Sequence, residues 1–275
     1  MIIGIDHLVV AVPDLDRATE AVRSGAGLAV TAGGRHPDHG TENRLVWFGD
    51  SYLELVGIVD VEQARGSWFG RLVAERLEHG GGLAAICLAS DDIDADLGAA
   101  QARGAVVEGP FSGERRRPDG RFVRWRLALP GALGPESAPF LIEHDVTAAE
   151  WTPSERAERA SFVHPVGGRV RLALVEVPVG DVAAVSLRYL RTWGILFRPS
   201  LAGGGARDGS VGDQVIRLRP RSRGGAGEPT LELVRVGVEG GVSLAGPLSS
   251  GADVGGATVV LPFGLRLRWR SVGPA

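Results

Sequence analysis

The first 60 residues combine short apolar runs with a single amphipathic segment. Residues 6–14 carry apolar side chains on both sides of the pleat, which predicts a strand covered by a helix on one face and by ligand or core on the other. Asp14 can cap a helix whose apolar positions recur at helical spacing. Three further strands are predicted at 28–31, 44–48 and 52–58.

The same order of strand, helix and three strands recurs from Gly82. A strand at 83–88 is followed by a helix that Asp91 or Asp92 can cap. Strand candidates then follow at 105–108, 121–129 and 139–144. The sequence therefore predicts a second module of the same kind.

A third copy begins near Arg169. Its strand at 170–177 precedes a helix capped by Asp181, and we align the strand at 230–236 with the last strand of the first module. Residues 239–275 have strand-like runs without a helix, so they form part of a fourth copy or close the third. The predicted fold is an α+β chain of tandem βαβββ modules, with paired modules at 1–60 and 82–146, a linker at 147–165, and a third module plus partial fourth at 166–275.

The amino-acid composition excludes several kinds of cofactor and site. The chain has no lysine, which excludes pyridoxal phosphate and a P-loop, and Gly203 to Gly205 lack the strand-to-helix frame of a nucleotide cradle. The single cysteine, Cys87, excludes an internal disulfide and lies in an apolar run, so we expect it to be buried. A net charge of -3 gives no reason to expect nucleic acid or an anionic membrane as partner.

The N-terminus is typical of a first strand and not of a signal peptide, because it has no basic leader and meets a charge at Asp6. No stretch approaches the roughly 20 apolar residues needed to cross a bilayer. We therefore expect a cytoplasmic protein whose partner is a small molecule. A homodimer is one form the chain could take, with the third module as the dimerising or cleft-covering element.

Five stretches carry a family resemblance, at residues 5–9, 33–45, 49–55, 124–128 and 139–143. They resemble the glyoxalase-like domain family of the vicinal-oxygen-chelate superfamily. The resemblance implies paired modules that curl into a half-barrel or barrel around a ligand cleft. In many superfamily members, side chains from the first and last strands of the modules hold a divalent metal in this cleft.

The resemblance places His7, Glu54 and Glu143 at metal-holding positions. Imidazole and carboxylate groups suit Zn, Fe, Mn or Ni. Ala84 stands where a further ligand is expected, which leaves one histidine and two glutamates. By analogy with superfamily isomerases, Glu143 is also the predicted catalytic base, leaving the metal to take a proton. In the alternative without metal, His7 lines a cleft and the glutamates pair with arginines such as Arg124.

The loop at 33–44 supplies the predicted substrate contacts His36, Thr41 and Asn43. Its glycines let the backbone approach a ligand closely. The alternative is that Thr41 and Asn43 only order the loop by bonding its own backbone.

Two more substrate contacts are predicted in the second module. Arg124 and Trp125 lie on a predicted strand, so an inward arginine beside an aromatic wall could clamp a substrate carboxylate, or the arginine is simply solvated. The run Arg115 to Arg117 is expected in a solvated turn. His144 and His164 have no sequence partners and are assigned no role.

Two functions are compatible with these residues. One is a metal-dependent lyase, isomerase or dioxygenase acting on a substrate with adjacent oxygens. The other is a metal-free protein that binds or sequesters a small molecule in the same cleft, as resistance proteins do. Ala84 favours the second function, and the pair His7 and Glu54 favours the first. A glyoxalase in the strict sense is less expected than either, because that activity would require more metal ligands than these positions supply.

Overall fold

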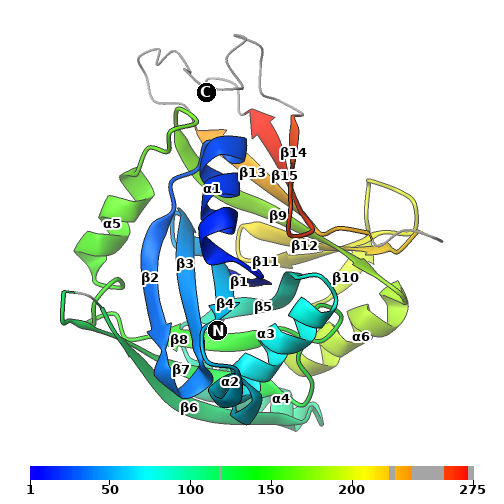
Figure 1. The fold of residues 1–275 in the computed structure, drawn as a ribbon. Helices are drawn as coiled ribbons and strands as arrows, with labels where there is room; N and C mark the ends of the chain where they lie inside the picture. The colour runs from blue at the N-terminus through cyan, green and yellow to red at the C-terminus, as the bar shows by residue number, and fades with distance from the viewer. Residues whose placement is uncertain (118, 223–226, 237–256, 272–275) are drawn as a thin grey trace.

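A computed structural model describes residues 1–117, 119–222, 227–236 and 257–271, which form two sheets with helices packed around them (Figure 1). The first sheet has eight strands in the order β2-β3-β4-β1-β5-β8-β7-β6. They are β1 (Ile2–Ala11), β2 (Thr31–His36), β3 (Thr41–Phe48), β4 (Ser51–Ile58), β5 (Gly82–Ser90), β6 (Val107–Arg116), β7 (Phe122–Pro130) and β8 (Phe140–His144).

The second sheet has seven strands in the order β10-β11-β12-β9-β13-β15-β14. They are β9 (Arg169–Val179), β10 (Phe197–Pro199), β11 (Arg207–Val211), β12 (Gln214–Pro220), β13 (Thr230–Val236), β14 (Thr258–Leu261) and β15 (Leu265–Ser271). The helices are α1 (Leu15–Ala26), α2 (Val61–Gly66), α3 (Trp68–Glu78), α4 (Ile93–Ala102), α5 (Pro153–Ser161) and α6 (Val182–Trp193), with a 3₁₀ turn, η1, at Pro37–His39. None of the helices described is long and apolar enough to cross a membrane.

The predicted module order is confirmed, and the caps explain why each helix begins where it does. The Asp14 carboxylate accepts hydrogen bonds from the first free amides of α1, and Gly27 ends the helix in the left-handed conformation at φ 64°. Asp92 and Asp181 cap α4 and α6 in the same way. The strand predicted at 28–31 is displaced, because β2 begins only at Thr31.

The third copy ends one strand earlier than predicted. The strand β12 runs parallel to β9, as β4 runs parallel to β1, while β13 is antiparallel to β9, as β5 is to β1. The alignment of 230–236 with the end of the first module is therefore wrong. Glu232, on β13, is not the counterpart of Glu54.

Two segments contain helices that the sequence did not indicate. Helices α2 and α3 follow the first module, and α5 lies inside the predicted linker. Helix α3 then buries Phe69, Leu72 and Val73 against the first sheet.

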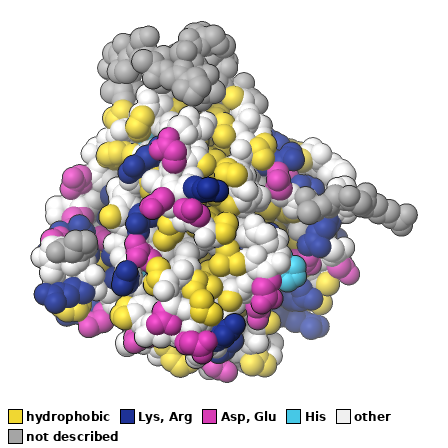
Figure 2. Space-filling model, viewed as in Figure 1, with side chains coloured by type: hydrophobic (Ala, Val, Ile, Leu, Met, Phe, Trp, Pro, Cys, Tyr) yellow, Lys and Arg dark blue, Asp and Glu magenta, His cyan; other side chains and the backbone are white. Residues whose placement is uncertain are grey.

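One apolar core joins the two sheets. Leu8 and Val10 of β1, Val175 of β9 and the buried faces of α1, α4 and α6 belong to the same cluster. A buried glutamine ties the halves together, because the Gln214 side chain accepts from the amide of Ile5 at 2.6 Å and donates to the Ser51 hydroxyl at 2.9 Å. On the visible outer face, acidic and basic side chains lie interspersed (Figure 2).

A buried histidine connects the segment between the two sheets to the first module. His164 accepts from the amide of Ala29 at 3.1 Å and donates to the carbonyl of Trp47 at 2.8 Å, so its ring is neutral. Burial lowers the pKa of His164 below its usual 6.5, although the bond to Trp47 opposes the shift.

This neutral histidine makes stability fall in acid. Below pH 6.5 the unfolded chain takes up a proton that folded His164 binds only at lower pH, so the unfolding free energy should fall by up to about 1.4 kcal/mol per pH unit for this group, until the folded pKa is reached. Urea unfolding between pH 7 and 5 should show a shallower fall for His164→Gln than for wild type. The variant of the exposed His79, His79→Gln, should retain the wild-type slope, and equal slopes in all three proteins would contradict this role.

Candidate functional site

A cavity of about 280 Å³ lies on the face of the first sheet that α1 and α4 do not cover. We call it the site cavity. Its polar side chains include His7, His36, Asn43, Glu54, Arg115 and His144, and its aromatic walls include Tyr52, Trp68, Phe69, Trp125, Phe140 and Trp151. The sheet contributes side chains from both paired modules, so the cavity is the ligand cleft that the fold predicts.

His7 is held by a carboxylate behind it. The pairing of β1 with β5 shifts between Ile5 and His7, and the Asp6 carboxylate lies 2.6 Å from His7 Nδ1. With Nδ1 engaged as donor, the lone pair of Nε2 faces the site cavity, where the carboxylate of Glu54 lies 3.7 Å away. Tyr52 stacks on the imidazole with ring centroids 4.7 Å apart, which fixes the plane of the ring.

Glu54 is oriented by Asn43. The Asn43 side-chain oxygen accepts from the amide of Gly34 at 2.7 Å, so its nitrogen must point the other way, where it donates to Glu54 Oε1 at 2.5 Å. Gly33 makes this possible, because a Cβ there would lie 1.8 Å from the Asn43 oxygen. The glycine pair of the loop therefore admits the asparagine that positions the carboxylate.

His36 approaches the same carboxylate from the end of β2. Its Nδ1 lies 3.0 Å from the Thr41 hydroxyl, and its Nε2 lies 3.7 Å from Glu54 Oε1. Burial lowers the pKa of His36 even though Glu54 acts in the opposite direction, so the ring is neutral. Thr41 is fully buried and contacts His36 without lining the cavity.

His144 is a residue of the site that sequence reasoning missed. Its Nε2 lies 2.9 Å from the free oxygen of Asp6, and its ring stacks on Trp151 with centroids 3.6 Å apart. Burial opposes ionisation of Asp6, yet His144, and after it His7, hold the pKa of this carboxyl well below its usual range. Asp6 is therefore a buried anion shared by two histidines that are 137 positions apart in the chain (144 − 7).

Arg115 is the second residue of the site that the sequence did not indicate. The prediction that it lies in a solvated turn is wrong. Its side chain is 6% exposed, because β6 extends through it and brings it against the loop of the first module. The guanidinium donates to the carbonyl of Gly33 at 3.1 Å and to both carboxylate oxygens of Glu150 at 2.9 Å. Arg116, its neighbour on the strand, is exposed.

Besides Thr41, two of the predicted residues lie outside the site cavity. Phe140, Ile142 and His144 face it along β8, so alternation turns Glu143 to the opposite face, where its carboxylate binds Arg126 and the amide of Ile93. Arg124 is exposed and pairs with Glu114. Trp125, from the same strand, does line the cavity.

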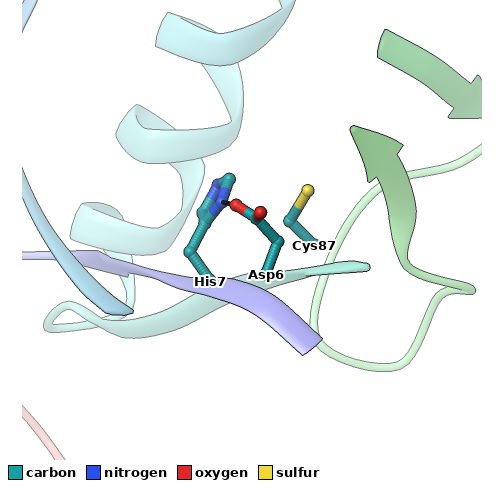
Figure 3. A group of neighbouring side chains, drawn as sticks. All are labelled: Asp6, His7 and Cys87. Atoms are coloured by element: carbon teal, nitrogen blue, oxygen red, sulfur yellow. Dashed lines mark hydrogen bonds and ion pairs between the residues drawn. The ribbon is translucent and has the colours of Figure 1, made fainter. Parts of the chain in front are cut away.

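His7 belongs to a compact group of potential metal ligands. The ligand atoms of Asp6, His7 and Cys87 lie within 4.8 Å of one another in the described part of the chain (Figure 3). Burial, and then the charges of Asp6 and Glu54, raise the pKa of the Cys87 thiol well above its usual range. A thiol must lose its proton to bind a metal, and Asp6 already contacts two histidines. Asp6 is therefore better suited to orienting His7 than the three residues are to holding an ion.

The comparisons with known proteins agree with this fold. Residues 5–193, well over half of the chain, match the glyoxalase-like domain family. The chain belongs to the glyoxalase-like domain family. The family is part of the vicinal-oxygen-chelate superfamily, whose members are small-molecule enzymes and binding proteins. No curated protein matches the sequence.

A solved structure shows the same fold over nearly the whole chain. A hypothetical protein from Staphylococcus aureus is 17% identical with a TM-score of 0.73, and the match covers 98% of this chain and 99% of that one. Methylmalonyl-CoA epimerase from Mycobacterium tuberculosis is 21% identical over 52% of this chain and 88% of its own, with a TM-score of 0.39. The epimerase from Streptomyces coelicolor is 24% identical over 52% of this chain and 98% of its own, with a TM-score of 0.39. At 17% identity, the likeness to the Staphylococcus aureus protein shows a shared fold and nothing more specific.

Proposed function

We propose that this glyoxalase-like protein is a divalent-metal-dependent enzyme that acts on a small substrate with adjacent oxygens. The ligands in this proposal are His7, His36 and Glu54. His36 takes the place that the sequence assigned to Glu143, whose carboxylate is engaged outside the site cavity. The reaction class is that of a lyase, an isomerase or a dioxygenase.

The observation that carries the proposal is the convergence of three acceptors. His7 Nε2 and His36 Nε2 each lie 3.7 Å from an oxygen of the Glu54 carboxylate, while their Nδ1 atoms are engaged by Asp6 and Thr41. The Asn43 amide nitrogen lies 2.5 Å from Glu54 Oε1 and 3.4 Å from His36 Nε2, and a bound cation would relieve the remaining repulsion among these lone pairs. Two imidazoles and one carboxylate form a donor set that suits Zn, Fe, Mn or Ni, so the residues fit such an ion.

The chain's own residues then have definite tasks. A bound divalent ion would supply Lewis-acid polarisation of a substrate oxygen. Asp6 keeps the Nδ1 proton on His7, and Asn43 restrains Glu54, so both present fixed lone pairs to the cavity. Trp125 and Phe140 offer an apolar wall to the body of the substrate. No proton transfer is assigned to Glu143, because it does not reach the cavity.

One observation favours the second candidate, a metal-free protein that binds or sequesters a small molecule. The second module adds no metal-binding side chain from β5, where Ala84 is fully buried in an apolar cluster. In that case His7 would carry a proton on both nitrogens and bind Asp6 and Glu54 without an ion.

Metal content distinguishes the two candidates. Protein purified without a metal-affinity tag and reconstituted with each ion should contain near-stoichiometric metal by elemental mass spectrometry. His7→Ala and Glu54→Gln should lose it, because each removes a ligand, while Glu143→Gln should retain it. Wild type without metal after reconstitution would favour the binding protein, and loss of metal in Glu143→Gln would contradict the ligand set proposed here.

A further inference from the structure

A second cavity, of about 720 Å³, lies between the first sheet, α5 and β9. We call it the inter-sheet cleft. Its apolar wall combines Ile5 and Phe48 of the first sheet with Val170 and Leu172 of the second. It is separate from the site cavity, since Ile142, His144 and Trp151 are the only described residues that line both.

The inter-sheet cleft is lined by four arginines and five carboxylates. Its four arginines are Arg156, Arg159, Arg169 and Arg171. Two carboxylates face them, since Asp50 pairs with Arg156 and Arg159 and Asp213 pairs with Arg171. The remaining carboxylates have partners of their own, namely Asp6 with His144, Asp91 with the N-terminal amine and Glu143 with Arg126.

Arg159 is the least satisfied of these arginines. Its guanidinium lies over the rings of Trp47 and Trp151, 4.4 and 4.9 Å from their centroids, and one Nη donates to the carbonyl of Glu150. Its Nε and other Nη are buried without a hydrogen-bond acceptor in the described residues. The nearest carboxylate oxygen in the described residues, on Asp50, is 3.6 Å away, which makes an ion pair but is too long for a hydrogen bond.

Unpaired donors on a buried cation are unfavourable, and an anion that accepts from them removes the penalty. Burial lowers the pKa of Arg159, although the carboxylates of Asp50, Glu150 and Glu155 act in the opposite direction. The apolar wall beside it would bury the body of such an anion.

We propose that the inter-sheet cleft is a second ligand site, which binds an organic anion through a carboxylate or phosphate head on Arg159 and an apolar body against Phe48 and Leu172. This site does not depend on the metal ligands of the site cavity. It is built by both sheets, so it exists only in the full chain.

Three naphthalene probes test the site by titration calorimetry on the full-length protein. Wild type should bind 1-naphthoate or 1-naphthyl phosphate, and the preferred head group tells which anion the site recognises. The uncharged 1-naphthamide should bind at least about tenfold more weakly, because it cannot take a charge-assisted bond from the guanidinium. This comparison needs no variant and is unaffected by any change in folding.

Variants then locate the bound anion. Arg159→Gln should weaken binding of the preferred anion by about tenfold or more, while Arg17→Gln, which removes an exposed arginine of α1, should leave it unchanged. Glu54→Gln should also leave it unchanged, which separates this site from the metal site even if the proposed function fails. No binding of either anion, equal binding of the amide, or unchanged affinity in Arg159→Gln would overturn the proposal.

Discussion

Replacing Asp6 with asparagine is expected to weaken divalent-metal binding by about 10–100-fold while leaving the protein folded. Asp6 is not itself a proposed ligand. Its carboxylate holds His7 Nδ1 at 2.6 Å and His144 Nε2 at 2.9 Å, and so sets which nitrogen of His7 faces the site cavity. An uncharged amide keeps the shape of the side chain. It makes the His7 ring a weaker electron donor to the metal, and it no longer fixes which ring nitrogen carries the proton.

Competition with a chromogenic chelator at fixed pH would measure this loss of affinity. The matched control is Asp50→Asn, which removes an acidic side chain of the neighbouring inter-sheet cleft that pairs with Arg156 and Arg159 and not with either histidine. The control should bind metal as wild type does. Wild-type affinity in Asp6→Asn would show that Asp6 has only a structural role, and a collapsed near-ultraviolet spectrum would show that the variant reports on folding.

Replacing Arg115 with leucine is expected to lower the unfolding free energy by about 3 kcal/mol. The arginine is 6% exposed and its two terminal nitrogens serve the carbonyl of Gly33 and the carboxylate of Glu150. Leucine would leave a buried carboxylate without its close counter-charge and a carbonyl without its donor. Arg117, whose Nη1 lies 3.6 Å from Glu150, limits the loss to the lower end of the range for broken buried pairs.

Urea unfolding at pH 7 would measure the change. Arg116→Leu is the matched control, since it removes the same charge from the next position of the same strand, where the side chain is exposed. Its effect should stay within about 0.5 kcal/mol of wild type. Equal destabilisation by the two substitutions would mean that the burial of Arg115 does not contribute to stability.

Local rules explain what the sequence predicted well. The caps at Asp14, Asp92 and Asp181 and the apolar runs beside them depend only on neighbouring residues, so the strand and helix that open each module were predicted three times. The same local stretches placed His7 and Glu54 on adjacent strands, where their side chains lie 3.7 Å apart.

The register of the strands could not be predicted from such local patterns. Side chains alternate across a strand, so an error of one position in aligning β8 with β4 turns a residue to the wrong face. That error put Glu143 among the proposed ligands, whereas its neighbours Ile142 and His144 line the site cavity. The assignment of 230–236 failed for a related reason, because parallel and antiparallel neighbours of β9 have similar apolar patterns.

The sequence by itself determined the repeated module, its helix caps and the first two members of the site, because each follows from interactions within a few residues. Tertiary structure alone decided the rest. His144 reaches Asp6 across 138 positions, and Arg115 reaches Gly33 across 82, through strand pairing that no local pattern encodes. Burial of those charged and polar groups is favourable only once the folded chain supplies their partners, so their roles exist in the fold and not in the sequence pattern.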